Sequence, residues 1–233
     1  MRRRTGSLLL VCLAAAGLSA WAQSTLVPKE LPNLGRLETE LRAYHDCTGH
    51  YGCYTTDLNR ETAQATAALE RLVRANQASA HPAKLAVVLD IDETSLSNWA
   101  EIAQADFAYN AAVWNQWVGD ARAPAIAGTL RFYQEAERLH VAVFFITGRP
   151  ESQRAATEKN LREQGYTQWD GLVLRSDKEL KLTAAVYKAA ERQRIVDDGY
   201  RLAVNVGDQR SDLAGAPRAE VSVKLSDPFY YIP

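Results

Sequence analysis

A short apolar segment that runs into two aspartates sets the first expectation for this chain. Residues 85–89 read L-A-V-V-L. Asp90 follows directly, and Asp92 follows after one further apolar residue. An unbroken apolar run of this length is typical of a strand buried on both faces of a parallel sheet. Open α/β sheets bind their ligands at the carboxyl ends of the strands. The segment therefore predicts a central strand that presents two carboxylates at the ligand-binding edge.

We expect both carboxylates on the same side of the chain, because side chains of an extended segment repeat every two residues. The hydroxyl of Thr94 would follow in the turn. Two neighbouring carboxylates repel each other unless a divalent cation or a shared proton lies between them. The alternative is local: Asp90 ends the strand in a turn, and Asp92 or Ser95 caps the next helix. The segment alone leaves both interpretations open.

The N-terminus has the pattern of a secretory leader. Arginines 2–4 precede an apolar run over residues 8–18, and an A-x-A cleavage signal ends at Ala22. An uncleaved anchor is the alternative, but the run is short for a bilayer span. A lipid anchor is not expected, because Cys12 lies inside the run and not after it. We expect a signal peptide over residues 1–22, no stable membrane anchor after cleavage, and a periplasmic or secreted chain.

Composition limits the kinds of partner that the chain can bind. It has 233 residues, of which 47% are hydrophobic and 24% charged, enough for one sizeable core. After cleavage 24 basic and 28 acidic residues remain, a net charge of −4. Such a surface does not attract a phosphate backbone, so no nucleic-acid polymer is expected as a partner. Composition says nothing about the oligomeric state.

Residues 23–84 are expected to form an N-terminal helical extension. Leu34, Leu37 and Leu41 recur at steps of three and four, and apolar residues continue this spacing in a second segment after residue 54. Between the two segments lie Cys47 and Cys53, the two cysteines of the expected mature chain. An even pair around a glycine-containing loop indicates a disulfide in an exported protein.

A zinc site is the alternative for this cysteine pair, because His45 and His50 lie close by. The four residues are crowded too closely for the usual spacing of two zinc-ligand pairs. The disulfide is therefore the favoured interpretation.

From residue 85 onward, strands alternate with helices. Such alternation predicts a parallel sheet with helices on both faces, a Rossmann-like α/β fold over residues 85–233. A helix is expected around residues 126–136, and another is expected to contain Lys188. Further buried strands are expected over residues 141–146, 171–174, 200–206 and 221–225.

Residues 97–124 interrupt this alternation and predict a small helical cap after the first strand. They contain Trp99, Trp114 and Trp117, three of the five tryptophans of the chain. Aromatic rings at helical spacing are typical of a small core. They also suit a lid that excludes water and stacks on a substrate, in which case Trp114 and Trp117 would contact it.

Two later strands also end in polar groups. Thr147 and Gly148 follow one strand, where a hydroxyl and backbone N–H groups can bind a phosphoryl oxygen. The alternative is that Thr147 caps the next helix. Asp208 and Asp212 follow another strand. Because parallel strands end at one edge of a sheet, these groups are expected to converge with the aspartates of the first strand. Lys188, taken alone, has the pattern of a solvated surface lysine.

Four blocks together resemble the haloacid dehalogenase (HAD) superfamily of phosphatases: D-I-D-E-T at 90–94, I-T-G-R at 146–149, Y-K at 187–188 and G-D-Q-R-S-D at 207–212. More narrowly, the chain is similar to subfamily IIIB, which holds bacterial class C acid phosphatases and plant vegetative storage proteins. That branch shares the W-x-x-W insertion and the closing P-F-Y-Y-I-P. The resemblance covers residues 34–233. It departs at residues 224–228, where the branch tends to carry a proline and an asparagine before the final proline, which leaves the backbone path of the tail open.

The resemblance implies a role for each of the acidic residues. Asp90 would be the nucleophile that forms an aspartyl phosphate. Asp92 would give a proton to the departing alkoxide and later take one from the attacking water. Mg²⁺ would be held by the side chains of Asp90 and Asp208 and by the main-chain carbonyl of Asp92, with support from Asp212.

The remaining site residues follow from the same resemblance. Thr147 and Lys188 would bind the transferring phosphoryl oxygens, and Thr94 and Gly148 would complete the substrate site. The implied function is a Mg²⁺-dependent acid phosphatase for small phosphomonoesters, for example nucleoside monophosphates. A non-catalytic storage or binding protein of the same fold and a phosphotransferase are the alternatives.

Overall fold

The computed structural model describes residues 31–232, and the part from residue 33 onward belongs to one compact unit. The predicted leader and its cleavage site lie outside the described residues. Within residues 31–232, no helix combines the length and the apolar character that crossing a membrane requires. The boundaries expected for the leader, the helical extension and the core stay predictions.

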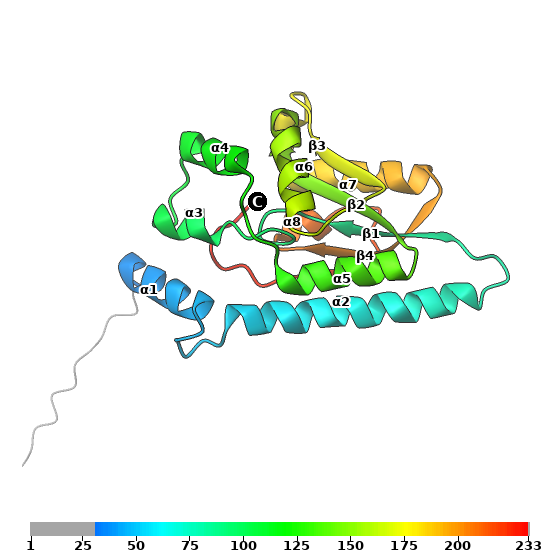
Figure 1. Ribbon diagram of the computed structural model, residues 1–233, viewed down its shortest axis with the longest axis horizontal. Helices are drawn as coiled ribbons and strands as arrows, with labels where there is room; N and C mark the ends of the chain where they lie inside the picture. The colour runs from blue at the N-terminus through cyan, green and yellow to red at the C-terminus, as the bar shows by residue number, and fades with distance from the viewer. Residues whose placement is uncertain (1–30, 233) are drawn as a thin grey trace, which may run out of the picture. The chain divides into compact units, whose positions relative to one another are not determined.

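A five-stranded parallel sheet forms the centre of this unit, in the order β3-β2-β1-β4-β5 (Figure 1). The predicted α/β class is confirmed. The central strand β1 pairs on one side with β2 and on the other with β4. The strand order reverses beside β1, so the loops after β1 and β4 flank the crevice where sheets of this kind bind ligands. The strands are β1 (Lys84–Leu89), β2 (Ala142–Pro150), β3 (Gly171–Arg175), β4 (Tyr200–Gly207) and β5 (Val221–Lys224).

Helices cover both faces of the sheet, as predicted (Figure 1). Successive residues of β1 point to opposite faces: Val87 and Leu89 join one buried cluster, whereas Val88 joins another. The first cluster includes apolar residues of α2, α5 and α6, and the second includes Tyr187 and Ile195 of α7. The bounds are α2 (Tyr54–Gln77), α5 (Ala127–Arg138), α6 (Arg154–Glu163) and α7 (Ala184–Asp197).

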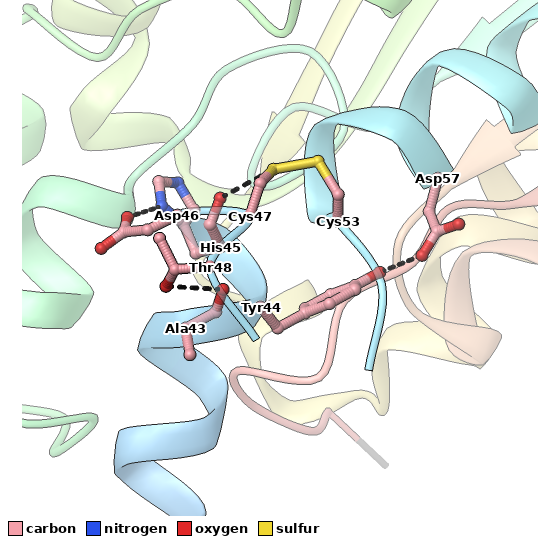
Figure 2. The surroundings of a disulfide bond; sticks show 8 residues. All are labelled: Ala43, Tyr44, His45, Asp46, Cys47, Thr48, Cys53 and Asp57. Atoms are coloured by element: carbon pink, nitrogen blue, oxygen red, sulfur yellow. Dashed lines mark hydrogen bonds and ion pairs between the residues drawn. A yellow bond between two sulfur atoms is a disulfide. The ribbon is translucent and has the colours of Figure 1, made fainter. Parts of the chain in front are cut away.

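Helix α1 (Leu34–His45) is joined to α2 by a short loop that a disulfide closes (Figure 2). Cys47 and Cys53 form this bond, so the predicted pairing is confirmed. Figure 2 also shows Tyr44 of α1 reaching the first turn of α2, where its hydroxyl donates to Asp57 Oδ2 at 2.6 Å. The ring of His45 stacks on Trp99 at 3.8 Å between centroids, which connects α1 to the segment after β1.

Two short helices, α3 (Trp99–Gln104) and α4 (Ala111–Asp120), follow β1 and form the predicted cap. The remaining short elements are the 3-10 helices η1 (Glu151–Gln153), after β2, and η2 (Glu179–Lys181), after β3, and the helix α8 (Arg210–Leu213), after β4. After β5 the tail returns towards the cap, where Phe229 packs against Trp99 at 4.8 Å between centroids. Ser226 donates through its backbone N and its hydroxyl to Glu61 of α2, which sets the backbone path that the sequence left open.

Candidate active site

Three aspartates meet where β1 and β4 end. Asp90 follows β1, Asp208 follows β4, and Asp212 lies in α8. One carboxylate oxygen from each lies within 4.8 Å of the others, and all three residues are buried. The backbone N of Asp90 donates to the carbonyl of Val206 at 3.1 Å, which fixes the end of β1 beside β4. The parallel sheet therefore brings together residues that are more than a hundred positions apart.

Lys188 of α7 supplies a positive charge to this cluster. Its Nζ lies 2.5 Å from Asp90 Oδ1 and 2.6 Å from Asp212 Oδ1. The residue is buried, not a surface lysine as its local sequence suggests. Burial by itself lowers the pKa of Lys188, but the two carboxylates outweigh it and raise that pKa above its usual value. The ammonium therefore stays charged between its two partners.

The cluster has the charge and the donor atoms that a divalent cation requires. Burial raises the pKa of Asp90 and of Asp208 well above the usual value, and the neighbouring Asp212 adds to this. Three carboxylates face one ammonium, which leaves an excess of two negative charges when all are ionised. Donor groups that offer only oxygen suit Mg²⁺ better than zinc. Asp90, Asp208 and Asp212 are thus the residues that could hold a divalent metal ion.

Two of these aspartates are oriented by their own neighbours. The hydroxyl of Thr94 accepts from the backbone N of Asp208 at 2.9 Å and donates to its Oδ1 at 3.1 Å. Thr94 is fully buried and orients Asp208; it is absent from the cavity wall where substrate contacts were expected. Asp212 Oδ2 accepts from the backbone N of Gln209 at 2.8 Å. A Cβ on Gly207 would lie 2.4 Å from the Asp212 side chain, so only glycine fits there.

Asp92 pairs with Arg149 and is not one of the three clustered aspartates. The guanidinium donates from Nη2 to Asp92 Oδ1 at 2.6 Å and from Nε to both carboxylate oxygens at 3.1 Å. Arg149 is almost fully buried and also donates to Thr157. Asp92 therefore does not cap a helix; the residue that precedes α3 is Asn98. Sequence reasoning assigned no role to Arg149, although it is the last residue of the I-T-G-R block.

Thr147 and Gly148 differ in how they meet the site. Thr147 is fully buried, and its Oγ1 accepts from the backbone N of Arg149 at 3.2 Å. It neither lines the cavity nor caps the next helix, because β2 continues to Pro150. Gly148 does line the cavity, and a Cβ added there would meet no atom within 4 Å. Its backbone is thus open to a bound molecule.

A cavity of about 580 Å³ opens over these groups. Asp90, Asp92 and Lys188 line it together with Asp208 and Asp212. The cap, η2 and the tail supply most of the apolar wall: Ile102, Phe107, Tyr109, Trp114, Leu180, Phe229, Tyr230, Tyr231 and Ile232.

Only one of the two tryptophans expected to contact the substrate lies on this wall. Trp114 lines the cavity, whereas Trp117 is absent from its lining. The indole Nε1 of Trp117 donates to Asn98 Oδ1 at 2.8 Å. A buried indole N–H usually finds a partner of this kind, and here the partner directs Trp117 towards the loop after β1.

The C-terminal tail contacts the cluster directly through Tyr230 and indirectly, by way of Gln209, through Asp227. Sequence reasoning missed both contacts. The hydroxyl of Tyr230 donates to Asp208 Oδ2 at 3.2 Å. The amide of Gln209 donates to the same oxygen at 2.7 Å and to Asp227 Oδ2 at 2.8 Å. Burial raises the pKa of Asp227 to about 6. The aromatic closing motif was the signal that pointed to this tail.

A family model and several known proteins match this chain. Residues 17–233 match the family described as HAD superfamily, subfamily IIIB (Acid phosphatase). Acid phosphatase 1 of Solanum lycopersicum is 39% identical over 150 residues, which are 62% of this chain and 58% of that protein. The stem 28 kDa glycoprotein of Glycine max is 36% identical over 157 residues, 65% of this chain and 61% of that protein. Vegetative storage protein 1 of Arabidopsis thaliana is 31% identical over 150 residues, 63% of this chain and 55% of that protein.

The fold has a counterpart among solved structures. The class C acid phosphatase from Bacillus anthracis superposes with a TM-score of 0.67 at 21% identity, covering 85% of this chain and 86% of that one. The chain spans less than two thirds of the length of the curated relatives described above. The family match covers nearly all of this chain. The chain therefore belongs to the HAD superfamily, subfamily IIIB, the acid phosphatase subfamily.

Proposed function

We propose that the chain is a Mg²⁺-dependent phosphomonoesterase that works through an aspartyl phosphate on Asp90. The observation that carries this proposal is the cluster of Asp90, Asp208 and Asp212 on the wall of a cavity, with Lys188 bonded to Asp90 and Asp212. A buried carboxylate beside an ammonium and a cation-binding set of oxygens is what in-line attack on phosphorus requires.

The reaction has two displacements. An Asp90 oxygen attacks phosphorus, the bond to the leaving oxygen breaks, and that oxygen takes a proton from Asp92. Water then attacks the aspartyl phosphate and returns a proton to Asp92, which releases phosphate and frees Asp90. Mg²⁺, when bound by the clustered aspartates, would offset negative charge on the phosphoryl oxygens. Lys188 and the open backbone at Gly148 would bind the same oxygens. Thr147 would instead stabilise the backbone after Gly148, because its Oγ1 accepts from the backbone N of Arg149.

The wall of the cavity favours a phosphate ester with a flat, apolar alcohol part. Phe107, Trp114 and Tyr230 offer ring faces or edges to such a group. Nucleoside monophosphates and aryl phosphates have this shape. A periplasmic or secreted location is supported by the disulfide between Cys47 and Cys53, since such bonds persist in oxidising compartments.

The test compares the wild type with Asp90→Asn on a panel of phosphate esters, from acidic to neutral pH, with Mg²⁺ or with EDTA. We expect hydrolysis by the wild type, loss of activity in EDTA, and activity near background for the variant, with a melting temperature close to that of the wild type. Asp198→Asn, which changes an exposed aspartate at the end of α7, is the matched control and should keep full activity. Mass spectrometry of acid-quenched enzyme should find one phosphoryl group on Asp90.

A wild type that is inactive on every ester in Mg²⁺ would instead favour a storage or binding role. That alternative agrees with the name of one of the plant relatives, vegetative storage protein 1. Adding glycerol to the assay separates hydrolysis from phosphotransfer, because a phosphotransferase would yield glycerol phosphate.

A further inference from the structure

Asn98 connects the cap to Asp92 through both ends of its carboxamide. Its Oδ1 accepts from the indole Nε1 of Trp117 at 2.8 Å. Its Nδ2 donates to Asp92 Oδ1 at 2.9 Å and to Glu93 Oε2 at 3.0 Å. Asn98 and Glu93 are almost completely buried. Helix α4 of the cap is thus joined by two hydrogen bonds in series to the residue proposed as the proton donor.

The chemistry of the partners fixes the orientation of this amide. An indole N–H only donates, so it must face the amide oxygen. The two carboxylates accept, so they must face the amide nitrogen, and both hydrogens of that nitrogen are used. Trp117 therefore selects the orientation in which Asn98 donates to Asp92.

The two oxygens of Asp92 are left in different surroundings. Oδ1 accepts from Arg149 Nη2 and Nε and from Asn98 Nδ2, at 2.6, 3.1 and 2.9 Å. Oδ2 accepts only from Arg149 Nε, at 3.1 Å, within the described residues. A carboxylate oxygen with three donors has no room for a proton, whereas Oδ2 does. Asp92 lines the cavity, so Oδ2 is the oxygen that can exchange a proton with a bound ester.

We propose that Trp117 and Asn98 are positioning residues for the proton transfer, which hold Oδ1 of Asp92 so that Oδ2 serves the leaving oxygen. This inference rests on the proposed phosphomonoesterase function. When the bond between phosphorus and the leaving oxygen breaks, its electron pair stays on that oxygen, which takes the proton from Asp92 Oδ2. Trp117 acts on the proton donor and not on the substrate, although it lies in the cap.

Misplacing the proton donor has a signature that depends on the leaving group. An alkoxide is a strong base and needs the proton as the bond breaks, whereas p-nitrophenolate is a weak base and leaves without it. Loss of the Trp117 hydrogen bond should lower kcat/KM for glycerol phosphate about tenfold, the effect of one hydrogen bond, and hardly change kcat/KM for p-nitrophenyl phosphate. The value of kcat/KM covers the steps up to the aspartyl phosphate and leaves out the later step, common to both esters, in which Asp92 takes a proton from water. A merely structural role would lower both alike.

Trp169 is a matched control for Trp117. Both rings are half-buried, and each lies under an arginine: Arg122 over Trp117 at 5.4 Å and Arg162 over Trp169 at 4.5 Å. Trp169 lines a different cavity, next to the amino ends of the strands. Exchange for phenylalanine keeps a ring in both places and removes the indole N–H.

The experiment measures kcat and KM of wild type, Trp117→Phe and Trp169→Phe for the two esters in saturating Mg²⁺. We expect the ratio of kcat/KM for glycerol phosphate to kcat/KM for p-nitrophenyl phosphate to fall about tenfold in Trp117→Phe alone. Asn98→Ser should lower the same ratio, which keeps the test decisive if Trp117→Phe folds poorly. In an Asp92→Asn background, Trp117→Phe should have no further effect on the ratio.

An equal fall of kcat/KM for both esters, or no fall for either, would overturn the inference while the phosphomonoesterase function stands. A wild type that hydrolyses neither ester would overturn the proposed function, and the inference with it.

Discussion

Lys188 lies between Asp90 and Asp212, with its Nζ 2.5 Å from one carboxylate and 2.6 Å from the other. These carboxylates come from the end of β1 and from α8, so the lysine joins two elements that meet only in the folded chain. It also offsets one of the three negative charges that the cluster carries when all three carboxylates are ionised. The structure of this corner of the sheet therefore depends on a single ammonium when no cation is bound.

Lys188→Met should destabilise the protein in EDTA. Methionine keeps much of the side-chain shape but leaves buried carboxylates without their partner, which costs about 3–5 kcal/mol in free energy of unfolding. Mg²⁺ should recover part of this loss, because it supplies positive charge to the same oxygens. Urea unfolding in EDTA and in Mg²⁺ measures both effects. Lys159→Met, which removes an exposed lysine of α6, should leave the urea midpoint unchanged; an equal midpoint for both variants would contradict the prediction.

Gly207→Ala should weaken Mg²⁺ binding. The new Cβ would lie 2.4 Å from the Cβ and from Oδ2 of Asp212, so that side chain must move away from the cluster. Overpacking of this kind costs about 1–3 kcal/mol of stability. Calorimetric titration with Mg²⁺ should give a higher Kd than for the wild type. Gly119→Ala in α4 is the control, since a Cβ there meets nothing within 4 Å; unchanged Mg²⁺ affinity in Gly207→Ala would exclude a role for Asp212 near the ion.

The sheet and its helices could be predicted because each signal is local. The apolar run before Asp90 is long enough to identify a buried strand. Apolar residues also recur in the four later strands, although β5 alternates them with polar ones. The strand ends then follow from topology, because all parallel strands finish at one edge. This is why Asp90 and Asp208 could be expected together although β1 and β4 are far apart in sequence.

The partners of the polar side chains could not be predicted, because distances in the folded chain decide them. Lys188 has the sequence surroundings of a surface lysine, yet its partner Asp90 lies 98 residues away. Arg149 pairs with Asp92 across 57 residues. Trp117 faces Asn98 and not the cavity, which neither helical spacing nor aromatic content specifies. Sequence patterns identify which groups gather at the edge, and packing selects which of them touch.

Replacing both Cys47 and Cys53 with alanine should lower stability without changing the fold. The bond closes a loop between residues six positions apart, and its loss frees that loop in the unfolded chain at a cost of about 2 kcal/mol. Thermal or urea unfolding measures the loss. A reducing agent should destabilise the wild type by a similar amount and leave the double variant unaffected; equal sensitivity of both proteins would show that the disulfide is not the source.

Asp227→Asn should flatten the pH dependence of stability in EDTA. Burial raises the pKa of Asp227 from 3.8 to about 6, so the folded state binds a proton more tightly than the unfolded state. Between these two pH values the free energy of unfolding therefore falls as pH rises, by at most about 3 kcal/mol from this residue. Asparagine carries no charge to desolvate, and its amide oxygen can still accept from the backbone N of Phe229, as Asp227 Oδ1 does at 2.9 Å.

Urea unfolding at several pH values across this window gives the slope for each protein. Asp90 and Asp208 also have raised pKa values because of burial, so the slope should shrink in Asp227→Asn but keep its sign. Asp198→Asn changes an exposed aspartate and should reproduce the wild-type slope. In Mg²⁺ the slope should reverse, because the ion binds ionised carboxylates and its affinity rises with pH. A steeper slope in Asp227→Asn would mean that Asp227 favours the folded state when it is ionised, contrary to the burial argument.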